Sequence, residues 1–171
     1  MAKFLSKNGK FYMRDGKLLQ YFSTLAAGDT WYKSSQNKAT ITKITLKNSY
    51  TPETTVDETW DASAAQDGSI MAYRTGTEII IAGNGSGKIF ANSDSQSAFN
   101  GFSGMKTFAG ADVLDTSKVT NISFMFNKCL ALTSISDLSK WNTSKVTNMK
   151  AMFQSCEKLT NIGNLSKWNV S

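Results

Sequence analysis

Few residues in this chain could do chemistry, because it contains no histidine and only two cysteines, Cys129 and Cys156. Histidine is the commonest general base, and the serine and cysteine triads depend on it. Histidine and cysteine also supply nearly all zinc and iron ligand sets. We therefore expect a protein that is not an enzyme and that holds no metal or other cofactor.

A glycine-rich segment that ends in a lysine, residues 83–88, follows an apolar run. A phosphate-binding loop needs Gly, four residues, Gly-Lys and then Ser or Thr, and a helix must follow it. Ala82 stands at the first glycine position and Ile89 at the Ser/Thr position. We interpret the segment as a hairpin turn and expect no nucleotide site.

Four acidic residues lie close together in the polar segment 48–68, namely Glu53, Asp57, Glu58 and Asp61. A paired-carboxylate site and a calcium loop are the two chemical interpretations. The spacing matches neither the alternating ligands of a calcium loop nor a defined carboxylate dyad. We predict a solvated acidic loop.

Lysines and tryptophans recur at a fixed interval in the second half of the chain. The candidate ligand-binding residues are Lys118, Lys140, Trp141, Lys145, Lys167 and Trp168. Rows of lysine could contact acidic cell-wall polymers, and stacked aromatic rings could bind sugar faces. Solvated lysines and core tryptophans are the alternatives. Asn-x-Ser triplets also recur, at Asn121, Asn142, Asn164 and Asn169; we attribute these triplets to composition.

The interval is 27 residues, as Phe126 and Phe153 or Cys129 and Cys156 show. We place a degenerate repeat at about 92–113, repeats at 114–140 and 141–167, and a partial repeat at 168–171. Apolar residues spaced +3, +4, +3 from Val146 predict one face of a short helix. Apolar residues at every third position from Leu159 predict a short strand. The two cysteines should be free thiols, because equivalent side chains of a stack point the same way.

These patterns predict an α+β fold. One repeat cannot bury its apolar faces alone, so we expect a leucine-rich-repeat-like right-handed solenoid with a parallel strand ladder. Residues 23–91 should form a β-rich segment, with a half-buried strand in 39–47 and a β-meander in 69–91 that caps the first repeat. The last rung lacks a cap, so we expect either further repeats beyond Ser171 or a neighbouring subunit on it.

Residues 1–22 predict an N-terminal β-meander, because Asn8-Gly9 and Asp15-Gly16 are preferred type I′ turn pairs. The strands should span about 3–7, 10–14 and 17–22. This arm is too small to bury its aromatic residues, which are Phe4, Phe11, Tyr12, Tyr21 and Phe22. Either the arm packs on its own domain, or these residues dock it onto another protein.

The net charge of +6 is spread along the chain, and Arg14 and Arg74 are its only arginines. Arginine is the usual residue for bidentate base or phosphate recognition, so we expect no nucleic-acid partner. No run of 18 apolar residues is present, and the opening residues lack the apolar core of an export signal. We expect no membrane insertion and no secretory leader.

The repeat resembles those of the BspA-like leucine-rich-repeat surface proteins, which read W-[DN]-T-S-x-V-T-N-M-x-x-M-F-x-x-C-x-x-L. Residues 142–149, Met152, Phe153, Cys156 and Leu159 match this pattern. Residues 67–102 are similar to the segment that precedes such repeats in that family. The resemblance implies a surface protein or adhesin, and related domains occur in bacteriophage virion proteins.

Our leading hypothesis is a non-enzymatic bacteriophage virion protein of the tail, baseplate or head. We expect its N-terminal arm to dock on other virion proteins, and we expect the chain to form a homo-oligomer. Its repeats would bind a host cell-surface glycan or protein. The missing export signal favours the virion over the alternative, a bacterial cell-surface adhesin.

Overall fold

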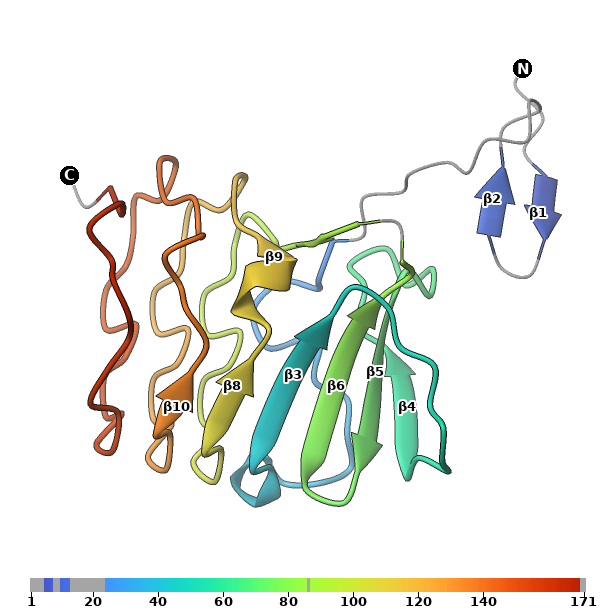
Figure 1. The fold of residues 1–171 in the computed structure, drawn as a ribbon, viewed down its shortest axis with the longest axis horizontal. Coiled ribbons are helices and arrows are strands. Elements are labelled where there is room, and N and C mark those ends of the chain that lie inside the picture. The colour runs from blue at the N-terminus through green and yellow to red at the C-terminus, as the bar shows by residue number, and fades with distance from the viewer. Residues whose placement is uncertain (1–4, 8–9, 13–23, 86, 170–171) are drawn as a thin grey trace.

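Figure 1 shows the computed structural model, which describes residues 5–7, 10–12, 24–85 and 87–169. These residues form ten strands and two 3-10 helices, η1 (Lys38–Thr40) and η2 (Ala111–Val113), and no α-helix occurs among them. The fold is mixed, with mostly strands and almost no helix. The short helix predicted for each repeat is therefore wrong in the described part of the chain.

A six-stranded mixed sheet in the order β10-β8-β3-β6-β5-β4 runs across the molecule (Figure 1). Its strands are β3 (Lys43–Lys47), β4 (Glu58–Asp61), β5 (Ile70–Thr75), β6 (Glu78–Gly83), β8 (Thr107–Ala109) and β10 (Ser134–Ile135). β4, β5 and β6 pair antiparallel, whereas β6, β3, β8 and β10 pair parallel. The parallel half carries the sheet into the repeats.

β3 joins the two halves of this sheet. Ile44 and Leu46 are buried and the alternate residues of the strand are partly exposed, which confirms the half-buried strand predicted in 39–47. Ile44 pairs with Ile79 of β6 on one side and with Phe108 of β8 on the other. The strand that meets the first repeat is therefore β3, and not the predicted meander of residues 69–91.

Two glycines of the first repeat allow this close approach. Gly110 has a φ of +74°, and a Cβ at this position would collide with the carbonyl oxygen of Leu46. A Cβ on Gly104 would collide with the carbonyl oxygen of Ala39. Only a residue without a side chain satisfies both the left-handed backbone and the short separation at Gly110.

The chain leaves the sheet after β6. β5 and β6 form the predicted hairpin around Gly76, but β7 (Ile89–Phe90) pairs parallel with β9 (Leu114–Asp115) and not with β6. The hairpin turn predicted at residues 83–88 is therefore wrong. Ile89 is fully buried, so its burial against the repeats outweighs the local preference for a tight turn.

The three repeats form three successive coils, which we call coil 1 (92–113), coil 2 (114–140) and coil 3 (141–167). Coils 1 and 2 are linked by a parallel bridge between Asp94 and Asn121, and coils 2 and 3 by one between Asn121 and Asn148. The ring of Phe126 lies 5.3 Å from that of Phe99 and 5.5 Å from that of Phe153, and both pairs are stacked. The interval of 27 residues thus places equivalent side chains over one another.

In coils 1 and 2, backbone amides alternate between hydrogen bonds within the coil and hydrogen bonds to the next coil. Within coil 2, the N–H groups of Met125 and Asn127 donate three residues back along the chain. Those of Phe124 and Phe126 donate to coil 3 at 2.9 and 2.8 Å. An α-helix would use every amide internally, so the +3, +4 spacing of apolar residues here belongs to a series of tight turns.

Left-handed residues at equivalent positions make these turns possible. Ser97, Phe124 and Ala151 have φ values of 59°, 57° and 55° in coils 1, 2 and 3. Residues with side chains rarely adopt this conformation, which costs roughly 1–2 kcal/mol per residue. Its recurrence in every coil shows that contacts between coils offset the local cost.

Residues 24–38 cover the open side of coil 1. The Trp31 indole N–H donates to the Ala98 carbonyl at 2.6 Å, and the Gly28 amide donates to the Asp94 carbonyl at 3.2 Å. Lys38 Nζ donates to the carbonyl of Asn100 at 3.3 Å. Trp31 is fully buried and stacks on Phe102. This segment, which we call the N-terminal cap, takes the place of a preceding coil.

The N-terminal arm is described in part. β1 (Leu5–Lys7) and β2 (Lys10–Tyr12) pair antiparallel, as predicted for the first hairpin of the arm. The predicted strand at 17–22, together with Phe4, Tyr21 and Phe22, lies outside the described residues. No long apolar helix that could cross a membrane occurs in the described ranges.

Replacing Trp31 with alanine tests the N-terminal cap. We expect Trp31→Ala to lower the free energy of unfolding by about 3–5 kcal/mol, because the change leaves a cavity and an unpaired carbonyl at Ala98. Urea denaturation followed by circular dichroism measures this loss. Lys106→Ala, an exposed control in coil 1, should change the free energy by less than about 0.5 kcal/mol. Equal effects of the two substitutions would contradict the assignment of the cap.

Candidate functional site

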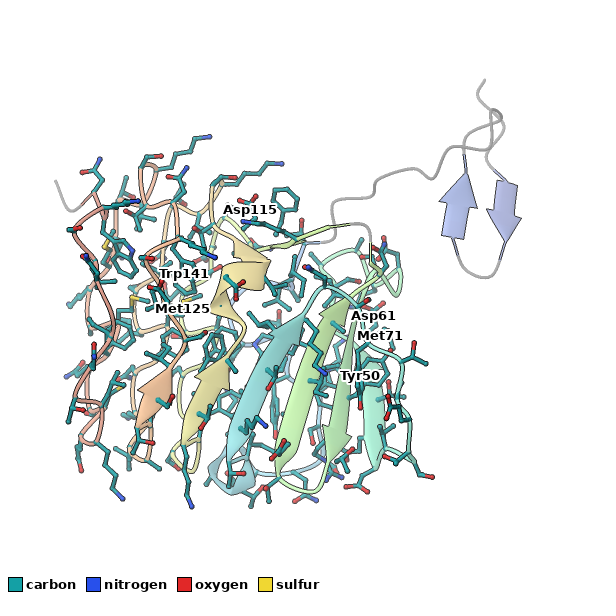
Figure 2. All side chains as sticks on the ribbon, viewed as in Figure 1. Tyr50, Asp61, Met71, Asp115, Met125 and Trp141 are labelled. Carbon is teal, nitrogen blue, oxygen red and sulfur yellow. The ribbon has the colours of Figure 1, made fainter. Side chains whose placement is uncertain are left out.

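The candidate lysines lie where each coil turns into the next. Lys118 and Lys145 occupy one repeat position, and Lys140 and Lys167 another, so each pair spans adjacent coils; all four are exposed. Figure 2 labels Asp115 near this edge of the coils. We call the four residues the lysine ridge.

Lys118 of the lysine ridge makes local contacts with an aromatic ring and an acidic residue. Lys118 Nζ lies 5.0 Å from the centre of the Phe90 ring, a cation–π distance. Asp115 is partly desolvated, but hydrogen bonds from Ser117 and the charges of Lys88 and Lys118 lower the pKa of its carboxyl. Asp115 is therefore ionised at neutral pH and offsets part of the positive charge at this point.

The two candidate tryptophans join coils. The rings of Trp141 and Trp168 stack with their centres 6.2 Å apart. The Trp141 indole donates to the Ala111 carbonyl at 2.9 Å, and the Trp168 indole donates to the Leu138 carbonyl at 3.2 Å. Trp141 is only 3% exposed. The structure thus places Trp141 in the core, beyond the reach of a sugar face.

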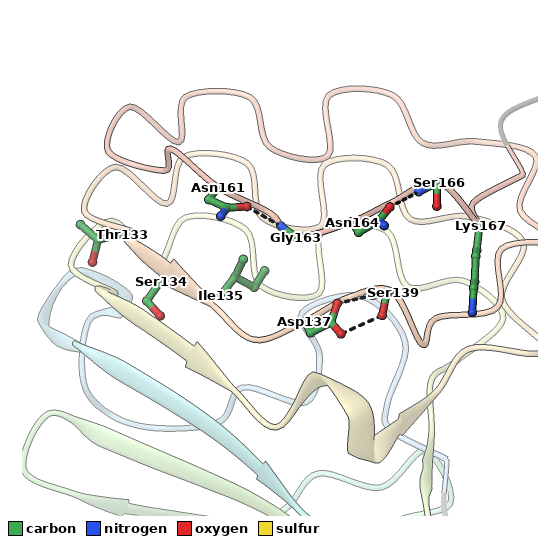
Figure 3. Close-up of a pocket in the computed structure, with 10 residues that line it drawn as sticks. All are labelled: Thr133, Ser134, Ile135, Asp137, Ser139, Asn161, Gly163, Asn164, Ser166 and Lys167. Atoms are coloured by element: carbon green, nitrogen blue, oxygen red, sulfur yellow. Dashed lines mark hydrogen bonds between the residues drawn. The ribbon is translucent and has the colours of Figure 1, made fainter.

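A cleft of about 550 Å³ opens between coils 2 and 3 (Figure 3). Lys167 lies at one end of it and connects it to the lysine ridge. The backbone amides of Thr133, Ser134 and Ser136 in coil 2 donate to carbonyl groups of the equivalent segment of coil 1, where β8 also pairs with β10. Within the described residues, no backbone hydrogen bond joins 133–139 to 160–166. The cleft therefore lies where the ladder between neighbouring coils is interrupted.

Polar groups line this cleft. The Asp137 carboxylate accepts bonds from the amide and hydroxyl of Ser139 at 2.8 and 2.7 Å, and these bonds lower its pKa. The side-chain oxygens of Asn161 and Asn164 accept backbone amides, at 2.8 and 2.9 Å. The asparagine NH₂ groups and the Lys167 ammonium group are among the side-chain donors that line the cleft. This arrangement suits a hydroxylated or anionic ligand and contains no activated nucleophile.

The acidic segment is more than the predicted solvated loop. Arg74 Nη1 lies 2.9 Å from an Asp57 oxygen, and Arg74 Nε lies 3.0 Å from a Glu58 oxygen. Arg74 is only 8% exposed, so these carboxylates compensate a largely buried charge. Asp61 accepts bonds from Ser63 and the Gly68 amide. The prediction of a solvated loop holds for exposed Glu53 and in part for Asp57, which is exposed but paired with Arg74; Glu58 and Asp61 are half-buried.

The Asn-x-Ser triplets have a structural role that the sequence analysis missed. The side-chain oxygen of Asn121 accepts the Ser123 amide at 3.0 Å, and that of Asn142 accepts the Ser144 amide at 3.0 Å. Asn164 forms the same turn with Ser166. The triplet at Asn169 extends beyond the described residues. The sequence carries a signal for these turns, because Asn or Asp recurs two residues before a serine.

The pH dependence of stability should reveal the Arg74 cluster. Hydroxyl groups of Ser34 and Ser35 and the Arg74 guanidinium lower the pKa of Glu58 from 4.5 to about 2. Since the folded pKa lies below the unfolded one, the stabilisation is complete above about pH 4.5 and is lost as the pH falls towards 2. Glu58→Gln should reduce the urea midpoint at pH 7 and flatten its fall below pH 4.5. The exposed control Glu53→Gln should follow the parent protein at every pH, and identical curves for both variants would contradict the role of Glu58.

The two cysteines are free thiols and should differ in reactivity. Burial raises the pKa of Cys129 to about 12 and also raises that of half-buried Cys156. The thiolate is the reactive form, so iodoacetamide at pH 8 should modify Cys156 first and Cys129 only after denaturation. Peptide mass spectrometry of timed samples separates the two sites. Equal rates in the native protein would show that Cys129 is accessible.

Comparisons with known proteins agree with the repeat pattern. Residues 93–171 match a family described as "Mycoplasma protein of unknown function, DUF285". No curated protein and no solved structure matches the chain. The matched domain is part of BspA-like repeat proteins, so the family resemblance is supported at this coarser level. Residues 93–171, which contain nearly all of the three coils, are accordingly similar to that repeat domain.

Proposed function

We propose that this chain is a non-enzymatic binding protein whose lysine ridge and adjoining cleft take an anionic polymer of a cell surface. The observation that carries the proposal is the repetition of lysine at two positions on adjacent coils, Lys118 with Lys145 and Lys140 with Lys167. A polymer that carries negative charges at regular intervals would complement this regular row of positive charges.

Electrostatics supports this ligand class. Like charges directly opposite each other on neighbouring strands are destabilising, and the coils place equivalent lysines one layer apart. An anionic polymer would relieve this repulsion, and the low arginine content favours point-charge attraction over bidentate recognition. Lys167 and the polar groups of the cleft would contact the hydroxyl groups of the same polymer.

We also propose a fold class for the coils. A leucine-rich-repeat-like right-handed solenoid is supported by the parallel pairing of β8 with β10 and by the stacked phenylalanines. Solenoids commonly present extended surfaces for binding. The lysine ridge lies along such a surface, on the turns that connect successive coils.

We place the protein in a bacteriophage virion, in the tail, baseplate or head, with residues 1–22 docked on other virion proteins or on further copies of the chain. The alternative is a bacterial cell-surface adhesin. Immunogold labelling of purified particles distinguishes the two: gold on the particles supports the virion, and gold on uninfected cells supports the adhesin.

Charge reversal tests the ligand site. The full chain with Lys118→Glu, Lys140→Glu, Lys145→Glu and Lys167→Glu should bind purified teichoic acid at least about tenfold more weakly, a loss of ~1.4 kcal/mol. The matched control reverses four exposed lysines outside the ridge, at Lys106, Lys128, Lys150 and Lys158. Binding by the parent should also weaken as salt rises. If both variants lose affinity equally, net charge explains the binding and the ridge does not.

A further inference from the structure

A second cavity, of about 240 Å³, lies on the outer face of the six-stranded sheet, opposite the core. The alternation of residues along β6 defines this face, because Ile79 and Ile81 are buried whereas Ile80 is partly exposed beside its cross-strand partner Tyr73. Figure 2 labels Tyr50 on this part of the sheet. The cavity is lined by Tyr50, Thr54, Tyr73, Thr75, Glu78 and Ile80, and none of these residues belongs to the lysine ridge or its cleft.

Two tyrosine rings form a corner in this cavity. The ring centres of Tyr50 and Tyr73 lie 5.2 Å apart, and the ring planes meet at 74°. Both side chains are half-buried, so part of each ring is open to a ligand. Burial and the neighbouring Tyr50 raise the pKa of Tyr73, so its hydroxyl stays protonated and able to donate at neutral pH.

Hydrogen-bonding groups surround the corner. In the described part of the chain, no other group forms a hydrogen bond with the hydroxyls of Tyr50, Thr54, Tyr73 or Thr75. Each of these hydroxyls can donate one hydrogen bond and accept others. Glu78 adds carboxylate oxygens, one of which lies 3.2 Å from Lys43 Nζ. The cavity thus offers several donors and acceptors beside an aromatic surface.

One wall of the cavity is the connection between β3 and β4, residues 48–57, which is held at both ends. The Asn48 carbonyl accepts the Gly85 amide at 2.9 Å. At the other end, the Asp57 carboxylate accepts the Gly76 amide at 2.7 Å. These contacts fix the connection against the sheet before any ligand binds. Binding therefore carries little of the cost of ordering a loop.

We propose that this cavity binds one uncharged pyranose ring of a glycan. The C–H face of such a ring packs on an aromatic ring, and its hydroxyl groups need donors and acceptors at the edge of that ring. The cavity is smaller than the roughly 300–1,000 Å³ of pockets that take drug-sized ligands, so it suits one sugar ring. This site is additional to the lysine ridge and does not depend on it.

Charge favours an uncharged sugar over a quaternary ammonium group, which also prefers aromatic walls and a carboxylate. Lys47 Nζ already lies 4.7 Å from the centre of the Tyr50 ring, and Lys43 pairs with Glu78. These two lysines outnumber the one acid in the lining, so their charge repels a second cation. The Glu78 carboxylate in turn disfavours an anionic ligand.

Saturation-transfer difference NMR on the full chain tests the proposal. The probes are the methyl glycosides of glucose, galactose, mannose and N-acetylglucosamine, with choline chloride as the cationic alternative. At least one glycoside should receive saturation at its ring protons, with a Kd of about 1 mM, as expected for a ligand of this size. Choline should receive none. Transfer to choline without transfer to any glycoside overturns the proposal, as does the absence of transfer to all five probes.

Substitutions of Tyr50 locate the binding. Tyr50→Ala should weaken binding of the glycoside at least about tenfold, whereas Tyr50→Phe keeps the ring and should weaken it only about two- to tenfold. The matched control is Thr51→Ala, an exposed neighbour in the same connection that does not line the cavity. Circular dichroism confirms that each variant is folded. Equal affinity of all three variants for the glycoside overturns the proposed site.

The sugar site and the lysine ridge are separable by experiment. The charge-reversed ridge variant should bind the glycoside with the affinity of the parent, because none of its four substitutions lines the cavity. Loss of teichoic acid with unchanged glycoside binding supports two independent sites. Loss of the glycoside by this variant contradicts the sugar site while leaving the proposed role of the ridge standing.

Discussion

The division of backbone amides between two directions is the constraint on which the rest of this structure depends. In coils 1 and 2, alternate N–H groups close tight turns and the others cross to the next coil. Buried backbone groups must be paired, so no coil satisfies its own hydrogen bonds without neighbours. The stacked phenylalanines, the left-handed residues and the asparagine turns all follow from keeping one coil in register with the next.

The sequence predicted the core of the repeats well and their backbone poorly. The 27-residue interval correctly paired Phe126 with Phe153 and Trp141 with Trp168, because identical environments select identical residues. The +3, +4 spacing around Val146 suggested a helix. A series of three-residue turns places apolar side chains on one side with nearly the same spacing, so periodicity could not distinguish the two. The positive φ of Phe124 and Lys128 has no signature in residue type.

Local sequence patterns could not predict contacts between residues that lie far apart in the chain. The strand in 39–47 was identified from its alternation, but its position between β6 and β8 depends on packing against residues more than 30 positions away. Likewise, the sequence placed Glu58 in an acidic segment without indicating that Arg74 pairs with it. Of the candidate site residues, the four lysines lie exposed along one edge, whereas Trp141 lies in the core. Burial of a tryptophan depends on which coil lies beside it.

The position of β3 has a consequence for how the chain acquires its structure. Coil 1 is built against β3 and the N-terminal cap, both of which precede it in the chain, and each later coil is built against the one before. During synthesis, the segment on which each coil packs therefore leaves the ribosome before the coil itself. Folding can proceed in the order of synthesis, with the slow closure of distant contacts confined to the initial β-rich segment and coil 1. The later coils form mainly nearest-neighbour contacts, so each can fold by packing on a coil that is already folded.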